Sequence, residues 1–315
     1  REQNIIRTIH RRGFRFIADV VESDDAENAV SDPPARSAQT SQTIRFCAAA
    51  DGVRIAYATA GSGPPLVKAS NWLNHLEYDW ESPVWRHVFE ELTRDHLLVR
   101  YDARGTGLSD WDVDDISFDA FVSDLEHVVD AVGLERFPLL GISQGCSFSI
   151  AYAVRHPERV THLVLYGGYA RGRNFWGSEQ EQERNRALKS LILNGWGMEN
   201  PVFRQVFTSL FIPDGTAEQA QWFNDLQRIT ATPENAYRIR EAGDQLDVED
   251  LLSKIQAPTI VLHCRDDAVA PFEEGRKMAA MIPNARFVAL EGKYHLLLED
   301  DPSWPIFMDH VREFL

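Results

Sequence analysis

Short apolar runs rich in Val, Ile, Leu and Phe recur from residue 43 to the end of the chain, separated by Gly, Pro, Asp and Asn. Such runs are typical of buried β-strands, whereas apolar residues at intervals of three and four predict amphipathic helices. Expected strands are Ile44–Ala49, Val53–Thr59, Leu66–Ala69, His96–Tyr101, Phe137–Ile142, Val160–Tyr166, Pro258–His263 and Arg286–Leu290. Expected helices are Pro83–Arg94, Phe118–Val132, Ser147–Arg155, Phe272–Met281 and Ile306–Phe314.

The order of these elements predicts the architecture. Strands that alternate with helices form βαβ units, which pack as a mostly parallel, doubly wound α/β sheet. Between about residues 169 and 250 the alternation stops, and the sequence is helical and rich in Trp and Phe. A strand–helix–strand crossover needs only about 30 residues, so this stretch is expected to be a helical cap inserted in the sheet domain. The core is then expected in two parts, 43–168 and 251–315.

The first 42 residues follow a different pattern. Two β-patterned runs, 5–10 and 14–17, are joined by Arg11-Arg12-Gly13, which predicts a hairpin because Gly accepts the positive φ of a tight turn. This segment, 1–18, resembles the C-terminal wing hairpin of an OmpR-type winged-helix DNA-binding domain, and a solvated basic hairpin is the plainer alternative. Residues 19–42 are acidic and almost free of large apolar side chains, so we expect a flexible linker.

Charge divides the chain in the same place. The net charge is −16, yet residues 1–16 hold five Arg and one Glu, so the rest carries about −20. The acidic body argues against nucleic-acid binding, and DNA is an expected partner only through an upstream domain that this chain lacks.

Because the chain begins with Arg, we expect it to be a fragment or processed form. No signal peptide and no apolar run of 18 residues occurs, and three cysteines make no disulfide framework, which predicts a cytoplasmic protein without membrane contact.

The segment Gly141-Ile142-Ser143-Gln144-Gly145 carries the strongest chemical signal. It matches G-x-S-x-G and lies between an expected strand and an expected helix, the context that this motif requires. Ser143 would occupy a strained turn with its hydroxyl exposed, and the two glycines would let the backbones pass closely. The sequence therefore predicts that Ser143 is a nucleophile.

A serine nucleophile needs a base, and the base needs an acid that orients it. Asp266 and Asp267 follow the strand that ends near His263, and His295 follows the next strand. Both loops come after the carboxyl ends of strands, where open α/β sheets bind their ligands. Adjacent acids are not separated by this pattern alone, so Asp266 and Asp267 both remain candidates here.

From about residue 43 to 315 the chain resembles an α/β-hydrolase with a helical cap. The resemblance rests on G-x-S-x-G, on the chain order Ser–Asp–His, on the Asp102–Ser109 loop, and on the D-D-x-V-x-P and G-x-x-H loops. It implies a Ser143–Asp267–His295 triad, with Asp267 preferred to Asp266. It also implies that the Asp102 loop stabilises the fold and that activity falls at acid pH as His295 becomes protonated.

One departure concerns the oxyanion hole. Many relatives carry His-Gly after the third strand, whereas this chain has Ser70-Asn71 there. Because the donors are backbone N–H groups, the hole is still expected, formed by Gln144 and by Trp72, whose position is assigned to within one residue. The loss of one donor would cost about 2.7–4 kcal/mol of transition-state stabilisation, so this departure bears on the catalytic rate rather than on the triad.

These features predict a serine hydrolase that cleaves an ester, thioester or lactone of a small apolar substrate, with no metal and no cofactor. Carbon–carbon bond hydrolysis and perhydrolysis use the same triad. The alternative is a ligand-sensing domain of a winged-helix transcriptional regulator with slow or no turnover. Expected substrate contacts are His75, Trp176, Trp196 and Trp222, although most cap aromatics form the cap's own core. A homodimer is left open.

Overall fold

The computed structural model describes residues 6–9, 13–16 and 41–315, and the chain divides into two units at Gln39/Thr40. In the first unit, β1 (Ile6–Ile9) pairs antiparallel with β2 (Gly13–Phe16), in a register that sets Ile6 opposite Phe16. The two expected strands are therefore confirmed. The turn between them and the predicted linker, up to residue 40, lie outside the described residues.

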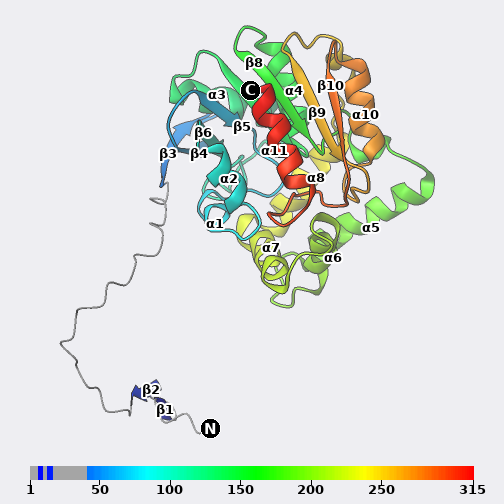
Figure 1. Cartoon of the computed structure of the whole chain (residues 1–315). Coiled ribbons are helices and arrows are strands. Elements are labelled where there is room, and N and C mark those ends of the chain that lie inside the picture. Colours follow the sequence, from blue (N-terminus) through cyan, green and yellow to red (C-terminus); the bar gives the residue numbers. More distant parts are fainter. Residues whose placement is uncertain (1–5, 10–12, 17–40) are drawn as a thin grey trace, which may run out of the picture. The chain divides into compact units, whose positions relative to one another are not determined.

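The second unit is built on one eight-stranded sheet with the order β10-β9-β8-β7-β5-β6-β4-β3 (Figure 1). The strands are β3 (Gln42–Ala48), β4 (Arg54–Ala60), β5 (Pro65–Lys68), β6 (Leu97–Tyr101), β7 (Phe137–Ile142), β8 (Val160–Tyr166), β9 (Thr259–Cys264) and β10 (Arg286–Leu290). The pairs from β6 to β10 are parallel, whereas β3–β4 and β4–β6 are antiparallel. The predicted mostly parallel, doubly wound sheet is confirmed.

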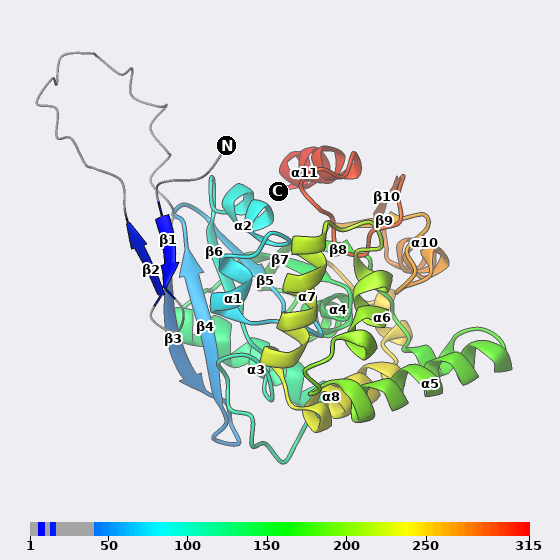
Figure 2. The same ribbon diagram turned by 90° about the horizontal axis from the view of Figure 1, so that it is seen from below.

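Helices cover both faces of this sheet. Its helices are α1 (Leu76–Trp80), α2 (Arg86–Leu92), α3 (Phe118–Val132), α4 (Gly145–Arg155), α9 (Glu249–Leu252), α10 (Phe272–Met281) and α11 (Ser303–Phe314). Figure 2 shows α2 and α11 on one face and α3, α4 and α10 on the other. Every residue of β9 is buried, as expected for a strand that is covered on both sides.

The chain between β8 and β9 forms a separate layer of helices. It contains a 3-10 turn (Arg173–Phe175), α5 (Glu179–Gly195), α6 (Val202–Phe211), α7 (Ala217–Thr230) and α8 (Pro233–Gln245) (Figures 1 and 2). Ser178, Thr216 and Thr232 begin α5, α7 and α8 by accepting backbone N–H bonds, which satisfies donors that the first turn leaves free. We call this helical layer, residues 173–245, the cap.

Buried charge holds the loop after β6. Asp102 Oδ2 accepts from the backbone N–H groups of Leu76, at 3.1 Å, and Leu108, at 2.8 Å. Arg104 is almost fully buried and pairs with Asp124 at 2.7 Å and with Asp51 at 2.6 Å. A buried charge is tolerated only with such partners, so these groups act within the fold.

No helix in the described part of the chain is long and apolar enough to cross a bilayer.

Candidate active site

Ser143 lies at a sharp turn between β7 and α4. Its φ is 55°, a left-handed value that a residue with a Cβ adopts only under strain. A Cβ on Gly141 would lie 2.7 Å from Cys146 Cα, and one on Gly145 would lie 2.7 Å from the Ser70 carbonyl oxygen. The two glycines of the motif therefore allow the close approaches that were expected from the sequence. They place Ser143 beside the loop that carries Ser70.

His295 and Asp267 are joined by a short hydrogen bond. His295 Nδ1 donates to Asp267 Oδ2 at 2.7 Å, and both side chains are fully buried. The other carboxylate oxygen, Oδ1, accepts from the backbone N–H groups of Val269 (2.8 Å) and Ala270 (3.1 Å). Burial opposes ionisation of Asp267, but His295, His263 and the Ala270 N–H outweigh it, and together they hold the pKa of the carboxyl below its ordinary value. Asp266, the alternative acid, is exposed.

His295 Nε2 is the free end of this pair. It is buried and has no hydrogen-bond partner within the described residues, Ser143 included. The ring of Phe211, which ends α6, lies edge-on to the His295 ring with centroids 5.0 Å apart. The backbone N–H of His295 donates to the Phe211 carbonyl at 3.1 Å. The cap therefore holds the histidine loop directly. An unpartnered, buried imidazole nitrogen is suited to accept a proton from a nearby hydroxyl.

His263 is a second buried histidine that the sequence did not single out. Its Nε2 lies 3.0 Å from the Ala270 carbonyl and 3.6 Å from Asp267 Oδ2. Burial lowers its pKa, so the ring is neutral at pH 7. Its bond to the Ala270 carbonyl fixes the loop whose N–H groups orient Asp267.

Two backbone N–H groups near Ser143 are free. Those of Trp72 and Gln144 donate to no acceptor in the described part of the chain, whereas the Asn71 N–H donates to Asn74 Oδ1 at 2.6 Å. Ser70 Oγ donates to the same oxygen at 3.0 Å, so Asn74 fixes the loop. Where many relatives carry His-Gly, this chain therefore has Ser70 and Asn71, both of which donate hydrogen bonds to Asn74 Oδ1.

Lys68 extends this network into the core. Its Nζ donates to Asn71 Oδ1 at 2.6 Å, and its ammonium lies 5.1 Å from the Trp85 ring centroid. Burial lowers the pKa of Lys68 and raises that of Asp79, which faces it in the same buried cluster. Sequence reasoning missed Lys68 and Asn74; a lysine that ends an otherwise apolar strand was the available signal.

A small cavity of about 10 Å³ lies beside Ser143. It is lined from the core by Trp72, Ser143, Gln144 and Tyr169, and from the cap by Arg173, Phe211, Arg240 and Gly243. Phe211 is one of the aromatic residues in which the cap sequence is rich, whereas the two arginines were not predicted as site residues. This volume holds at most about one water molecule, so the cavity has no room for a substrate in this conformation.

The four side chains predicted to contact substrate do not line this cavity. Trp196 is buried and packs on Trp72 with ring centroids 5.4 Å apart. Trp222 stacks on Tyr78, Trp176 packs edge-on against Tyr169, and His75 begins α1 by accepting the Tyr78 N–H. Their contact with substrate stays a prediction, and Trp196 approaches the cavity only through Trp72.

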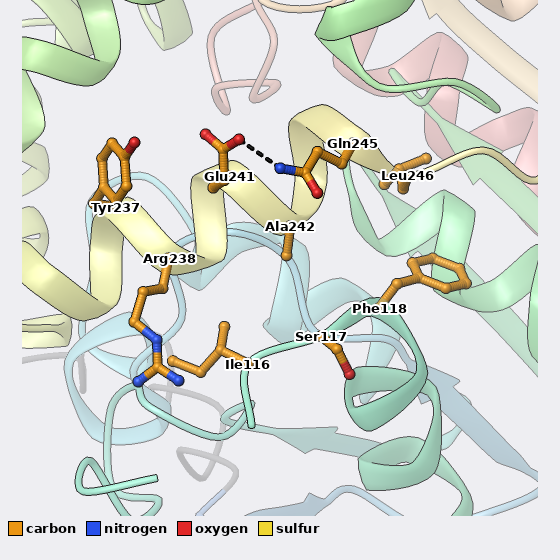
Figure 3. A pocket seen from close by; sticks show the side chains of 9 residues that line it. All are labelled: Ile116, Ser117, Phe118, Tyr237, Arg238, Glu241, Ala242, Gln245 and Leu246. Atoms are coloured by element: carbon orange, nitrogen blue, oxygen red, sulfur yellow. Dashed lines mark hydrogen bonds between the residues drawn. The ribbon is translucent and has the colours of Figure 1, made fainter. Parts of the chain in front are cut away.

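A larger hollow lies elsewhere on the molecule. Figure 3 shows this groove of about 440 Å³ between α8 and residues 116–118, with Tyr237, Arg238 and Glu241 on its helical wall. None of Ser143, Asp267 and His295 lines it. Its size therefore does not make it the catalytic site. No cluster of three or more metal-binding side chains occurs among the described residues.

Known proteins share both the fold and the sequence pattern. The chain is 30% identical over 229 residues to a putative carbamate hydrolase RutD of Pseudomonas savastanoi pv. phaseolicola, covering 70% of this chain and 85% of the relative. It is 28% identical to a 2-hydroxy-6-oxo-2,4-heptadienoate hydrolase of Pseudomonas putida, covering 70% and 75%. The solved structure of an esterase from Exiguobacterium antarcticum superposes with a TM-score of 0.72 at 24% identity, covering 86% and 99%.

The family model for the alpha/beta hydrolase fold matches residues 74–302, a span that includes Ser143, Asp267 and His295. It covers most of the sheet domain and the whole cap. The superposition on the esterase structure agrees with the fold of the second unit. The chain belongs to the α/β-hydrolase family and is an enzyme of the hydrolase type.

Proposed function

We propose that this hydrolase cleaves an ester, thioester or lactone through an acyl-enzyme formed on Ser143. The observation that carries the proposal is the combination of a strained Ser143, with φ 55°, and an oriented His295: its Nδ1 donates to Asp267 at 2.7 Å, and its Nε2 has no partner among the described residues. A nucleophile on a strand–helix turn and an oriented base are the two parts that acyl transfer requires.

In the first half-reaction, His295 Nε2 accepts the proton of Ser143 as Oγ attacks the carbonyl carbon. The backbone N–H groups of Gln144 and Trp72, which are free within the described residues, would donate to the oxyanion. His295 then donates the proton to the leaving oxygen or sulfur, and the ester bond breaks. In the second half-reaction, water attacks the acyl-enzyme with His295 again as base, which releases the acid and restores Ser143.

Asp267 is proposed to hold His295 in the tautomer that leaves Nε2 free to accept. A carboxylate with a lowered pKa stays ionised throughout and stabilises the imidazolium that forms. The relatives' names, which include a carbamate hydrolase, a dienoate hydrolase and an esterase, support hydrolysis in general. The small size of the cavity, with the rings of Phe211 and Trp72 in its wall, supports a small substrate.

Hydrolysis of p-nitrophenyl acetate by wild type and Ser143→Ala tests the proposal. The variant is expected to lose at least about 10³-fold in kcat, because the remaining triad members contribute little without the nucleophile. Ser147→Ala is a matched control, since Ser147 is also buried on α4 and its hydroxyl donates to the Tyr169 carbonyl at 2.6 Å. Undiminished hydrolysis by Ser143→Ala would contradict the assignment.

A ligand-sensing role in a winged-helix regulator is the second candidate. The antiparallel β1–β2 pair is the observation that favours it. The same Ser143 site would then bind a ligand with slow turnover or none. Tight binding of a small ester with negligible hydrolysis would favour the sensor, and fast turnover at micromolar substrate would favour the enzyme.

A further inference from the structure

Two arginines of the cap, Arg173 and Arg240, line the small cavity beside Ser143, whose wall also includes the apolar rings of Trp72 and Phe211. Arg173 comes from the 3-10 turn and Arg240 from α8, so two separate cap elements supply the charge. Arg240 is 6% exposed, and its guanidinium lies 5.8 Å from the Trp72 ring centroid. Burial of an arginine is costly, so two of them beside a nucleophile call for an explanation.

The protein's own carboxylates do not balance this charge. Asp244 is fully buried and faces three cations: Arg240 at 2.9 Å, Arg173 at 3.5 Å and Lys189 at 3.9 Å. Glu241 is the second acid of the cluster and pairs with Lys189 at 2.6 Å. Three cations therefore face two carboxylates, which leaves one positive charge without a partner in the cluster.

The hydrogen-bonding capacity of the cluster is also incomplete. Arg240 donates from Nε to Asp244 and from Nη2 to Asn185 Oδ1, at 2.7 Å, and its Nη1 has no acceptor among the described residues. Gln144 is 4% exposed, and its buried side-chain Nε2 has no hydrogen-bond partner in the part of the chain that the structure describes. A Cβ on Gly243 would lie 2.7 Å from that nitrogen, so the amide reaches the α8 wall of the cavity. These unused groups are donors, which require an acceptor.

We infer that the hydrolase site takes substrates that carry a carboxylate, held by Arg173, Arg240 and the Gln144 side-chain amide. The inference rests on the proposed function and names the substrate class of that same site. Guanidinium groups bind carboxylates through charge-assisted, often bidentate hydrogen bonds. The unbalanced charge in a water-poor cavity favours an anion over its neutral analogue.

Two pairs of substrates test this inference. In one pair the carboxylate lies on the acyl side of the scissile bond, and in the other it lies on the leaving group. The first pair is p-nitrophenyl hydrogen glutarate against p-nitrophenyl valerate, and the second is 4-acetoxybenzoate against 4-acetoxybenzamide. The wild type is expected to show a higher kcat/KM for the anion in at least one pair, by about tenfold to hundredfold. Equal or lower values for the anion in both pairs overturn the inference.

Arg173→Gln is the variant of choice, because Arg173 is the less buried of the two. Arg173 pairs with Asp244 at 3.5 Å and donates from Nη2 to the Val269 carbonyl at 3.1 Å, whereas Arg240 donates to both Asn185 and Asp244 in the buried interior. The kcat/KM of the anion should fall by about tenfold or more relative to that of the neutral ester, so that the preference for the anion is lost, and Arg173→Lys should recover part of that preference. Arg171→Gln is the matched control, since Arg171 pairs with Asp247 at 3.1 Å and does not line the cavity. Equal losses for anion and neutral ester would mean that Arg173 only supports the fold.

Thermal unfolding separates recognition from catalysis. Glutarate and benzoate, each against its amide, should raise the Tm of the wild type but not that of Arg173→Gln. If no ester is hydrolysed while the anions still stabilise through Arg173, the proposed function fails and the inference stands. If the neutral esters are hydrolysed and neither anion is preferred or stabilising, the proposed function stands and the inference fails.

Discussion

His295 Nδ1 and Asp267 Oδ2 lie 2.7 Å apart in the buried interior, while Asp266, one residue earlier, is exposed. After Asp267 the backbone bends, so that the N–H groups of Val269 and Ala270 donate to Asp267 Oδ1. Adjacent residues of the same type therefore have very different environments. Only Asp267 is oriented toward the histidine.

Replacement of these two acids should separate them kinetically. Asp267→Asn is expected to lower kcat for p-nitrophenyl acetate by about 10³–10⁴-fold, because the amide no longer stabilises the imidazolium or selects its tautomer. Asp266→Asn makes the same chemical change at an exposed position and should leave kcat within about twofold. Equal effects of the two substitutions would contradict the assignment.

The space around Gly145 predicts a steric effect on catalysis. Gly145→Ala brings a Cβ to 2.7 Å from the Ser70 carbonyl oxygen and displaces the loop that carries the Trp72 N–H. We expect kcat to fall by about tenfold or more, since a misplaced oxyanion donor is costly. Gly197→Ala in the cap is the control, because its Cβ meets nothing nearer than 3.4 Å. An unchanged kcat in Gly145→Ala would show that the loop is not held by this contact.

His87 predicts how stability depends on pH. Its Nε2 bonds to the Leu297 carbonyl at 3.0 Å, next to the His295 loop, and burial lowers its pKa below the ordinary value of 6.5. As pH falls through about 6.5, the unfolded chain therefore binds a proton at His87 more readily than the folded chain does. The contribution of neutral His87 to stability is fully present above that pH and is lost progressively below it.

His87→Gln removes this titration, and the amide can still donate to Leu297. The variant is expected to be somewhat less stable at pH 8 but to lose less Tm between pH 7 and pH 5 than the wild type. Thermal unfolding across that range measures the difference. Parallel Tm curves would mean that other groups, such as His263, whose pKa is also lowered by burial, cause the acid sensitivity.

Much of the sheet domain could be predicted because its strands are buried on both faces and are bounded by turn residues. Phe118–Val132, Val160–Tyr166 and Arg286–Leu290 were expected with the bounds that the structure gives. The five-residue helix Leu76–Trp80 was missed, since it is too short to show a helical period. Helix α2 begins at Arg86, later than expected, because Ser82 Oγ instead accepts from the N–H groups of Val84 and Trp85.

The residues of the site also divide into those that the sequence predicted and those that it did not. Ser143, Asp267 and His295 follow strands that the pattern identifies, so their convergence at one edge of the sheet could be expected. Arg173 and Arg240 could not be placed, because the way cap helices pack decides which side chains face the core. The buried Lys68 depends on partners, such as Asn71, that only the folded backbone brings within reach.

The central claim is that Ser143 is the nucleophile, and covalent labelling tests it most directly. Wild-type protein treated with a fluorophosphonate should gain the mass of one adduct, located on the peptide that contains Ser143, and excess p-nitrophenyl acetate should slow the labelling. Asp267→Asn should react far more slowly and Ser143→Ala not at all. An adduct on another residue, or equal labelling of Ser143→Ala, would contradict the account.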